Sequence, residues 1–189
     1  MTLAVFGGTF NPVHVGHLFL AEEVSTKLGY DLVLFVPAFI PVHKDVVVEP
    51  GPEHRLAMLR LALDPYPRFR VEDCELRRRG PSYTIDTVRE IFDRYALDGK
   101  PGLIIGDDLV EGFGTWKEAG QLAEMTRLIV GHRASTEQVH MPYPCTYVDN
   151  SLLPVSSSQI RGRLKEGHSV RHLVPDPVLD YIVRHGLYS

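Results

Sequence analysis

Two histidines, three residues apart, follow two glycines and an Asn-Pro pair near the start of the chain. The stretch reads GGTFNPVHVGHL and runs from Gly7 to Leu18. Glycine lets backbone N–H groups approach a ligand closely, and the unpaired N–H groups at a helix start attract anions. His14 and His17 flank the helix start expected after Pro12, where both can donate to phosphate oxygens and, as imidazolium ions, offset negative charge. The stretch predicts an anion site, against the alternative of a surface turn with two incidental histidines.

Other common phosphate and metal sites do not fit this stretch. It contains neither the G-x-x-x-x-G-K-[ST] string nor the G-x-G-x-x-G string. A histidine-only metal site needs further ligands nearby, and the sequence shows no matching cluster. The two cysteines, Cys74 and Cys145, lack the C-x-x-C spacing of structural zinc sites. We therefore predict no metal bound by the protein itself, and we expect both cysteines to be buried thiols.

A second helix start, near the end of the chain, carries hydroxyl groups and an arginine. It reads VSSSQIR, from Val155 to Arg161. Serine hydroxyls, amide N–H groups and a guanidinium one turn into the helix together suit a triphosphate. Alone, this segment is better explained as an N-cap with a solvated arginine. Together with the first motif, it predicts the second half of a phosphate site.

The elements that must position these residues alternate between strands and helices. Short apolar runs predict buried strands, and apolar residues at helical spacing predict helices. The expected strands cover residues 3–6, 32–36, 69–76, 103–105, 128–130 and 146–148, and the expected helices begin after Pro12 and Pro52 and near Thr84, Trp116, Ser156 and Asp176. This alternation predicts an α/β protein with a doubly wound parallel sheet, in which ligands bind beyond the carboxyl ends of the strands.

Two further segments have a distinct composition. Residues 37–52 contain four prolines, and a loop of that length in a compact domain is usually functional. Residues 77–80 read RRRG and predict a solvated basic turn.

Size and charge narrow the class of protein. The chain has 189 residues and a net charge of -4, so we expect one domain and no binding to nucleic acid. No apolar run approaches the roughly 20 residues of a membrane span, and the start MTLAVFGG has no basic leader. We therefore expect a cytoplasmic protein without a membrane partner, and the sequence leaves a homo-oligomer open.

The first motif resembles the signature of the nucleotidyltransferase superfamily, which shares its adenylyl-transfer chemistry with class I aminoacyl-tRNA synthetases. That signature is G-[TS]-F-[DN]-P-x-H-x-G-H, and this chain has Asn11 where many relatives have Asp. VSSSQIR resembles the second motif, I-S-S-[TS]-x-[IV]-R. The resemblance implies a Rossmann-like nucleotidyltransferase fold over residues 1–189, with a small helical part from about 155 to 189. It also implies Mg²⁺ carried with ATP, and ATP contacts at Gly7, Gly8, Thr9, Phe10, His14, His17, Ser156, Ser157, Ser158, Ile160 and Arg161.

Three further stretches resemble the bacterial nicotinate mononucleotide adenylyltransferases. PAFIPVHK is similar to P-x-x-x-P-P-H-K, PSYTIDT to P-S-Y-T-x-D-T, and GDD to G-A-D, with a tryptophan ten residues after the glycine. The resemblance implies that the helix start at Thr84 receives the nicotinate carboxylate and that the indole of Trp116 stacks on the pyridine ring. The implied contacts with the mononucleotide are Gly8, His43, Lys44, Ser82, Tyr83, Thr84, Asp108 and Trp116. Asp107 replaces a small residue of the family.

The resemblance implies transfer of the adenylyl group of ATP to nicotinate mononucleotide, which gives deamido-NAD and pyrophosphate in NAD biosynthesis. A phosphate oxygen of the mononucleotide attacks the α-phosphorus, so catalysis is positioning plus charge stabilisation. The residues expected to stabilise charge are His14, His17, Lys44 and Arg161. Nicotinamide mononucleotide and phosphopantetheine remain alternative acceptors, and a non-catalytic nucleotide-binding protein is an alternative of another class.

Overall fold

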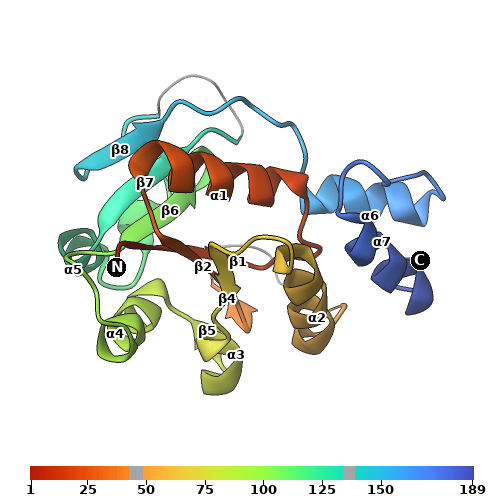
Figure 1. The fold of residues 1–189 in the computed structure, drawn as a ribbon, viewed down its shortest axis with the longest axis horizontal. Helices are drawn as coiled ribbons and strands as arrows, with labels where there is room; N and C mark the ends of the chain where they lie inside the picture. Colours follow the sequence, from red (N-terminus) through yellow and green to blue (C-terminus); the bar gives the residue numbers. More distant parts are fainter. Residues whose placement is uncertain (43–48, 134–138) are drawn as a thin grey trace.

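The computed structural model describes residues 1–42, 49–133 and 139–189. Its centre is a six-stranded sheet in which every neighbouring pair of strands is parallel (Figure 1). The strands are β1 (Leu3–Gly8), β2 (Leu32–Pro37), β4 (Phe69–Val71), β6 (Gly102–Gly106), β7 (Arg127–Gly131) and β8 (Cys145–Val148). Their spatial order is β4-β2-β1-β6-β7-β8, and β3 (Ile40–Pro41) pairs separately with β5 (Pro81–Ser82). The predicted doubly wound parallel sheet is confirmed.

Helices cover both faces of this sheet (Figure 1). One core holds side chains of α1 (Val15–Leu28), α2 (Pro52–Leu63), α6 (Ser157–Lys165) and α7 (Asp176–Arg184). The opposite core holds side chains of α3 (Cys74–Arg78), α4 (Thr84–Arg94) and α5 (Ala119–Met125). Successive residues of a strand point to opposite faces, so Ala4 and Phe6 enter the first core and Leu3 and Val5 the second.

The first helix begins and ends close to where the sequence predicts. Its N-cap is His14, and Gly29 ends it with φ 73° while donating its N–H to the Ser25 carbonyl oxygen at 3.1 Å. Glycine favours this left-handed conformation because it has no Cβ. At the other end, the Val15 N–H donates to the Leu173 carbonyl oxygen at 3.0 Å. The C-terminal segment therefore helps to fix the helix start that carries the histidines.

The strand predicted over residues 69–76 is shorter than expected. It ends at Val71, and α3 follows, because the Arg77 N–H turns back to donate to the Asp73 carbonyl oxygen at 3.0 Å. The three arginines of the predicted basic turn are exposed, as expected for a solvated segment. Arg77 and Arg78 belong to α3 rather than to the turn, and they pair with Glu72 and Glu90, each at 2.9 Å. The turn itself is made by residues 79 and 80, which both have positive φ.

Two other expectations need correction. The helix expected near Trp116 begins at Ala119, because a short 3₁₀ turn, Phe113–Thr115, comes first. Cys74 is buried as predicted, whereas Cys145 is only partly buried.

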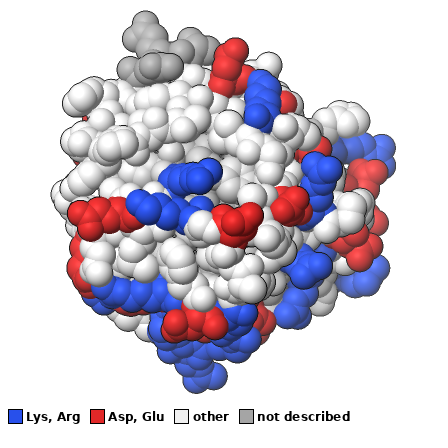
Figure 2. Space-filling model, turned by 60° about the vertical axis from the view of Figure 1, so that its left-hand side comes forward, with Lys and Arg blue, Asp and Glu red and all other residues white. Residues whose placement is uncertain are grey.

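Acidic and basic side chains lie beside each other on the molecular surface (Figure 2). Ion pairs between α4 and the start of α5 show this arrangement, with Arg89 on Glu118 at 2.6 Å and Lys117 on Asp86 at 2.9 Å. Within the described ranges, no helix is long and apolar enough to cross a membrane.

Candidate active site

A cavity of about 630 Å³ opens at the carboxyl ends of β1 and β6. These adjacent strands are where the chain order of the sheet reverses, which is the usual ligand position in such folds. Thirteen of the predicted site residues line the cavity: Gly7, Gly8, Thr9, Phe10, His17, Ser82, Thr84, Asp108, Trp116, Ser156, Ser157, Ser158 and Arg161. The fold thus brings together motifs that are far apart in the sequence.

The remaining predicted residues lie elsewhere or are not described. His14, Tyr83 and Ile160 are not among the residues that line the cavity. Ile160 is fully buried in the core, so its side chain is not presented to a ligand. The Lys117 ammonium lies 4.8 Å from the centre of the Tyr83 ring. His43 and Lys44 fall outside the described residues, and the roles of all five stay predictions.

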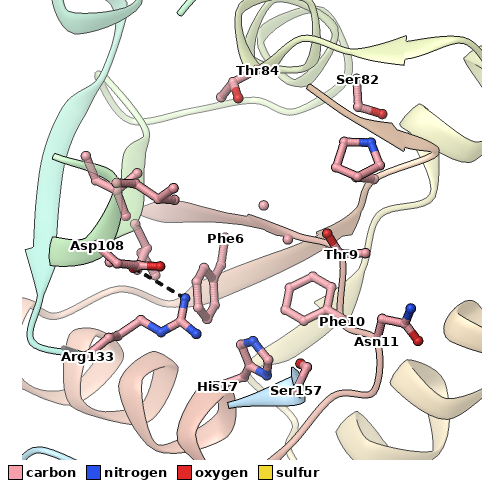
Figure 3. Close-up of a pocket in the computed structure, with 18 of the residues that line it drawn as sticks. Phe6, Thr9, Phe10, Asn11, His17, Ser82, Thr84, Asp108, Arg133 and Ser157 are labelled. Atoms are coloured by element: carbon pink, nitrogen blue, oxygen red, sulfur yellow. Dashed lines mark ion pairs between the residues drawn. The ribbon is translucent and has the colours of Figure 1, made fainter. Parts of the chain in front are cut away.

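The first turn needs its second glycine for steric reasons. Phe10 has a φ of 49°, and its buried ring packs back onto Gly8. A Cβ at Gly8 would lie 2.9 Å from the Phe10 Cζ atom. The same ring contacts His17 edge-on, with ring centres 5.0 Å apart. Gly8 therefore permits the packing that places the histidine at the cavity wall (Figure 3).

The two histidines stack on each other at the start of α1. Their ring centres are 3.7 Å apart, and the His14 backbone N–H donates to His17 Nδ1 at 3.3 Å. Because Nδ1 accepts this bond, the proton of a neutral His17 ring is on Nε2. A Cβ at Gly16 would come within 3.1 Å of His14 Nδ1. The glycine between the histidines thus leaves room for the His14 ring.

His14 lies beneath the cavity surface in an unusual state. It is 1% exposed, and both of its ring nitrogens are buried without a hydrogen-bond partner among the described residues. Burial, together with the nearby charge of Arg133, lowers the pKa of His14 to about 3. His14 is therefore neutral at pH 7 in the protein without ligand, and its expected charge beside a bound phosphate stays a prediction.

The serine-arginine motif is bound directly to the first turn. Ser157 Oγ donates to the Pro12 carbonyl oxygen at 2.9 Å, and Arg161 Nη1 donates to the Asn11 carbonyl oxygen at 2.8 Å. Ser156 caps α6 by accepting the Gln159 N–H at 3.1 Å. The starts of α1 and α6, about 150 residues apart in sequence, therefore meet at one side of the cavity.

Asn11 connects this side of the cavity to two other segments. Its Oδ1 accepts the Tyr188 hydroxyl at 2.6 Å, and its Nδ2 donates to the Glu49 carbonyl oxygen at 3.3 Å. The second bond needs an amide donor, which the aspartate of many relatives lacks. The sequence analysis assigned no role to Tyr188.

Two arginines at the site were missed by the sequence analysis. Arg133 lines the cavity, with Nη1 3.7 Å from Asp108 Oδ1 (Figure 3). Asp107 Oδ1 accepts the backbone N–H of Arg133 at 3.0 Å. Arg55 is only 3% exposed and donates to the Thr9 carbonyl oxygen at 2.8 Å. Arg133 lies just beyond the end of β7, which is a signal for a ligand contact, whereas Arg55 lies inside an ordinary helix.

The opposite side of the cavity carries the segment predicted to bind the acceptor. Ser82 and Thr84 face His17 and Ser157 across the open space (Figure 3). Ser82 Oγ accepts the Phe39 backbone N–H at 2.9 Å, which ties this segment to the residues after β2. Trp116 also lines the cavity and is 9% exposed.

Comparison with known proteins places the chain in a family. The model of the cytidylyltransferase-like family matches residues 5–163. The chain belongs to this family. It is 38% identical over 188 residues to a probable nicotinate-nucleotide adenylyltransferase of Borrelia garinii subsp. bavariensis, covering 100% of this chain and 95% of the relative. It is 41% identical over 187 residues to a protein of the same name from Bacillus licheniformis, covering 99% and 98%.

A solved structure shows the same fold. It is Plasmodium falciparum nicotinic acid mononucleotide adenylyltransferase complexed with NaAD, and the TM-score is 0.79 at 17% identity. The match covers 99% of this chain and 97% of the other. It supports the Rossmann-like nucleotidyltransferase fold of this member of the family.

Proposed function

We propose that this protein transfers the adenylyl group of ATP to nicotinate mononucleotide, giving deamido-NAD and pyrophosphate. One observation carries the proposal: a single cavity is lined by both phosphate motifs, by Ser82 and Thr84 on its other side, and by Trp116. Relatives that are 38% and 41% identical along nearly the whole chain, each named a probable nicotinate-nucleotide adenylyltransferase, support it.

The triphosphate lies, in this proposal, between the starts of α1 and α6. Both helix starts direct N–H groups and a positive dipole end at that side of the cavity. His17 offers its Nε2 proton, and Arg161 offers a charge that is held in place by its bond to the Asn11 carbonyl oxygen. These donors stabilise the charge that builds up on the phosphates as pyrophosphate leaves. No nucleophile from the protein is required.

His14 acts through the His17 ring, because it stacks on that ring and does not itself line the cavity. Its ring is neutral without ligand, and the negative charge of a triphosphate raises its pKa. His14 then stabilises the His17 ring on which it stacks. Lys44, which is outside the described residues, completes the proposed set of charge-stabilising groups.

The acceptor occupies the opposite side. Trp116 offers a flat ring for the pyridine, and the start of α4 offers N–H groups for the carboxylate. Asp108 lies between the two sides and suits a ribose hydroxyl. The α-phosphorus and the attacking phosphate then meet in the middle of the cavity.

The divalent metal in this proposal is Mg²⁺, and it arrives with ATP as part of the substrate. Within the described ranges, no three His, Cys, Asp or Glu side chains are grouped to hold a metal ion. Hard oxygen ligands suit Mg²⁺, and ATP phosphates provide them.

The test is pyrophosphate release from ATP with each of three acceptors: nicotinate mononucleotide, nicotinamide mononucleotide and phosphopantetheine. We expect the highest kcat/KM with nicotinate mononucleotide. A higher value with either other acceptor contradicts the substrate assignment, and no release with any of them favours a non-catalytic nucleotide-binding protein.

A further inference from the structure

A buried carboxyl group on the acceptor side has no role in the proposed reaction. Glu75, on α3, is 6% exposed and lines the cavity together with Ser82 and Thr84. Burying a carboxyl group where a carboxylate ligand is expected is unfavourable if both are ionised. The protonation state of Glu75, which its hydrogen-bond partners influence, therefore matters for a ligand at this end of the cavity.

Two hydroxyl groups point their protons at Glu75. Thr87 Oγ1 donates to Glu75 Oε1 at 2.5 Å and accepts from Arg78 Nη2 at 3.0 Å. The Ser82 hydroxyl also forms a side-chain hydrogen bond with Glu75, while its oxygen accepts the Phe39 N–H. A guanidinium and an amide N–H can only donate. When Glu75 is ionised, the protons of both hydroxyls are directed to it, and the Ser82 proton is not offered to a ligand.

The surroundings of Glu75 raise the pKa of its carboxyl group on balance, although the hydrogen bonds from Thr87 and Ser82 lower it. Burial is the largest cause and raises the pKa of Glu75. Arg78 on α3 lowers this pKa, and Glu90 on α4 raises it. The adjacent Cys74 thiol is neutral because burial raises its pKa to about 12. The described residues of the 38–42 segment and of β5 carry no charged side chain.

We propose that Glu75 sets the preference of this cavity between an acid and an amide acceptor, acting through the Ser82 hydroxyl. The inference rests on the proposed function, because it takes the nicotinate carboxylate to lie at this end of the cavity. Glu75 is a specificity-determining residue that acts by positioning a proton, and it takes no part in the chemical step.

Protonation of Glu75 changes what Ser82 offers to the ligand. A proton taken from solvent lets Glu75 donate to Ser82 Oγ, and Ser82 then turns its own proton toward the cavity. In that state the site presents a hydroxyl donor to a carboxylate and removes a like charge. In the ionised state the site presents acceptor oxygens, which suit the N–H groups of a carboxamide. Binding of the acid acceptor is thereby linked to uptake of one proton.

The experiment compares kcat/KM for nicotinate mononucleotide with kcat/KM for nicotinamide mononucleotide from pH 5, just above the ordinary pKa of a glutamate, to pH 9. Both acceptors carry the same phosphate, and both use the same ATP site, so their titrations cancel in the ratio. We expect the acid-to-amide ratio of the wild-type protein to fall about tenfold as pH rises, the effect of one hydrogen bond to a charged group. If the amide turns over too slowly, its inhibition constant replaces its kcat/KM.

Glu75→Gln mimics the protonated state, because its amide donates to Ser82 while its oxygen still accepts from Thr87. We expect this variant to keep a high acid-to-amide ratio that no longer changes with pH. Calorimetry in two buffers of different ionisation enthalpy measures how many protons are taken up on binding. The wild type should take up more protons with the acid acceptor than with the amide acceptor. Glu75→Gln should show no such difference.

Glu72→Gln is the matched control. Glu72 is also 6% exposed, but it pairs with Arg77 and Arg94 and is not among the residues that line the cavity. We expect the acid-to-amide ratio of Glu72→Gln to change with pH in the same way as that of the wild type. A wild-type ratio that is independent of pH, or a Glu75→Gln ratio that still falls with pH, overturns the proposal. If the proposed function itself is wrong, the result differs, because the wild type then releases no pyrophosphate with either mononucleotide.

Discussion

The two histidines of the first motif differ in their exposure to ligand. His17 lines the cavity and carries the proton of its neutral ring on Nε2, while His14 is buried and has a lowered pKa. In the proposed function, the pair combines a direct donor to phosphate with a group whose charge responds to the ligand. Each role predicts a different effect of substitution.

Replacement of His17 by alanine removes a positioned donor. By analogy with the loss of one oxyanion donor, we expect kcat to fall about 10²–10³-fold. Steady-state pyrophosphate release measures this, with circular dichroism as a check that the fold is intact. Turnover near that of the wild type would falsify the assignment of His17.

The low pKa of His14 makes the protein less stable in acid. The unfolded chain takes up a proton at His14 below about pH 6.5, whereas the folded protein does so only near pH 3. The free energy of unfolding thus falls as pH drops through this window, and His14 alone accounts for about 2–3 kcal/mol at pH 4.5. Urea unfolding between pH 7 and pH 4.5 measures the slope.

The variant His14→Gln removes this titration, so we expect a shallower loss of stability in acid. His168→Gln is the control, because His168 is an exposed histidine. Equal slopes for wild type and His14→Gln would show that His14 is not buried in its neutral form.

At the scale of elements, the C-terminal part of the chain supports the first turn, and its helix α6 also lines the cavity. Ser157 and Arg161 of α6 donate to backbone carbonyls of that turn, and Tyr188, beyond α7, donates to Asn11 Oδ1. Burial raises the pKa of the Tyr188 phenol, which keeps it protonated as a donor. The geometry of the phosphate side therefore depends on the last residues of the chain.

Tyr188→Phe tests this dependence. Loss of the hydroxyl leaves Asn11 Oδ1 without this donor, which costs about 1–3 kcal/mol of stability. We also expect KM for ATP to rise several-fold, with KM for the mononucleotide unchanged, because only the phosphate side is disturbed. Tyr181→Phe is the control, since the Tyr181 hydroxyl bonds to His54 at 3.0 Å, and neither residue is among those that line the cavity. A KM for ATP that does not change in Tyr188→Phe contradicts the supporting role.

Local sequence patterns predicted the strands and helices well and the boundaries between them less well. The strands around residues 3–6, 32–36, 103–105 and 128–130 follow from continuous apolar runs that parallel packing buries on both faces. The strand predicted to extend to residue 76 ends earlier, because Glu72 and Asp73 form ion pairs with Arg77 that favour the helical turn of α3.

The site was predictable where it consists of contiguous motifs. The GGTFNPVHVGH and VSSSQIR segments each describe a helix start, and their resemblance to two motifs of one family predicted that they would meet at the cavity that both line. Arg55 and Glu75 were not predictable, because their roles depend on contacts with Thr9 and Thr87 that only the folded chain creates. The neutral state of His14 likewise follows from burial, which spacing alone does not reveal.

At the scale of the whole molecule, the proposed function divides the cavity into a phosphate side and an acceptor side, which are built from different segments. We propose that residues 1–189 act as one catalytic unit, because α6 of the C-terminal part supplies a wall of the cavity. Trp116, the only tryptophan of the chain, lines this cavity and is the residue proposed to stack on the acceptor.

A fluorescence titration can follow ligand binding through the emission of Trp116. We expect nicotinate mononucleotide to quench the emission of Trp116 without ATP present, because the pyridine stacks on the indole. ATP alone should change the emission little, since its site is on the other side of the cavity. Quenching by ATP but not by the mononucleotide would reverse the assignment of the two sides.

The central claim is that one cavity joins ATP to nicotinate mononucleotide. The most direct measurement is pyrophosphate release from ATP and each mononucleotide, with the dinucleotide product identified by mass. The account predicts deamido-NAD as the product and a higher kcat/KM for nicotinate mononucleotide than for nicotinamide mononucleotide. A preference for nicotinamide mononucleotide, or no product from either, contradicts it.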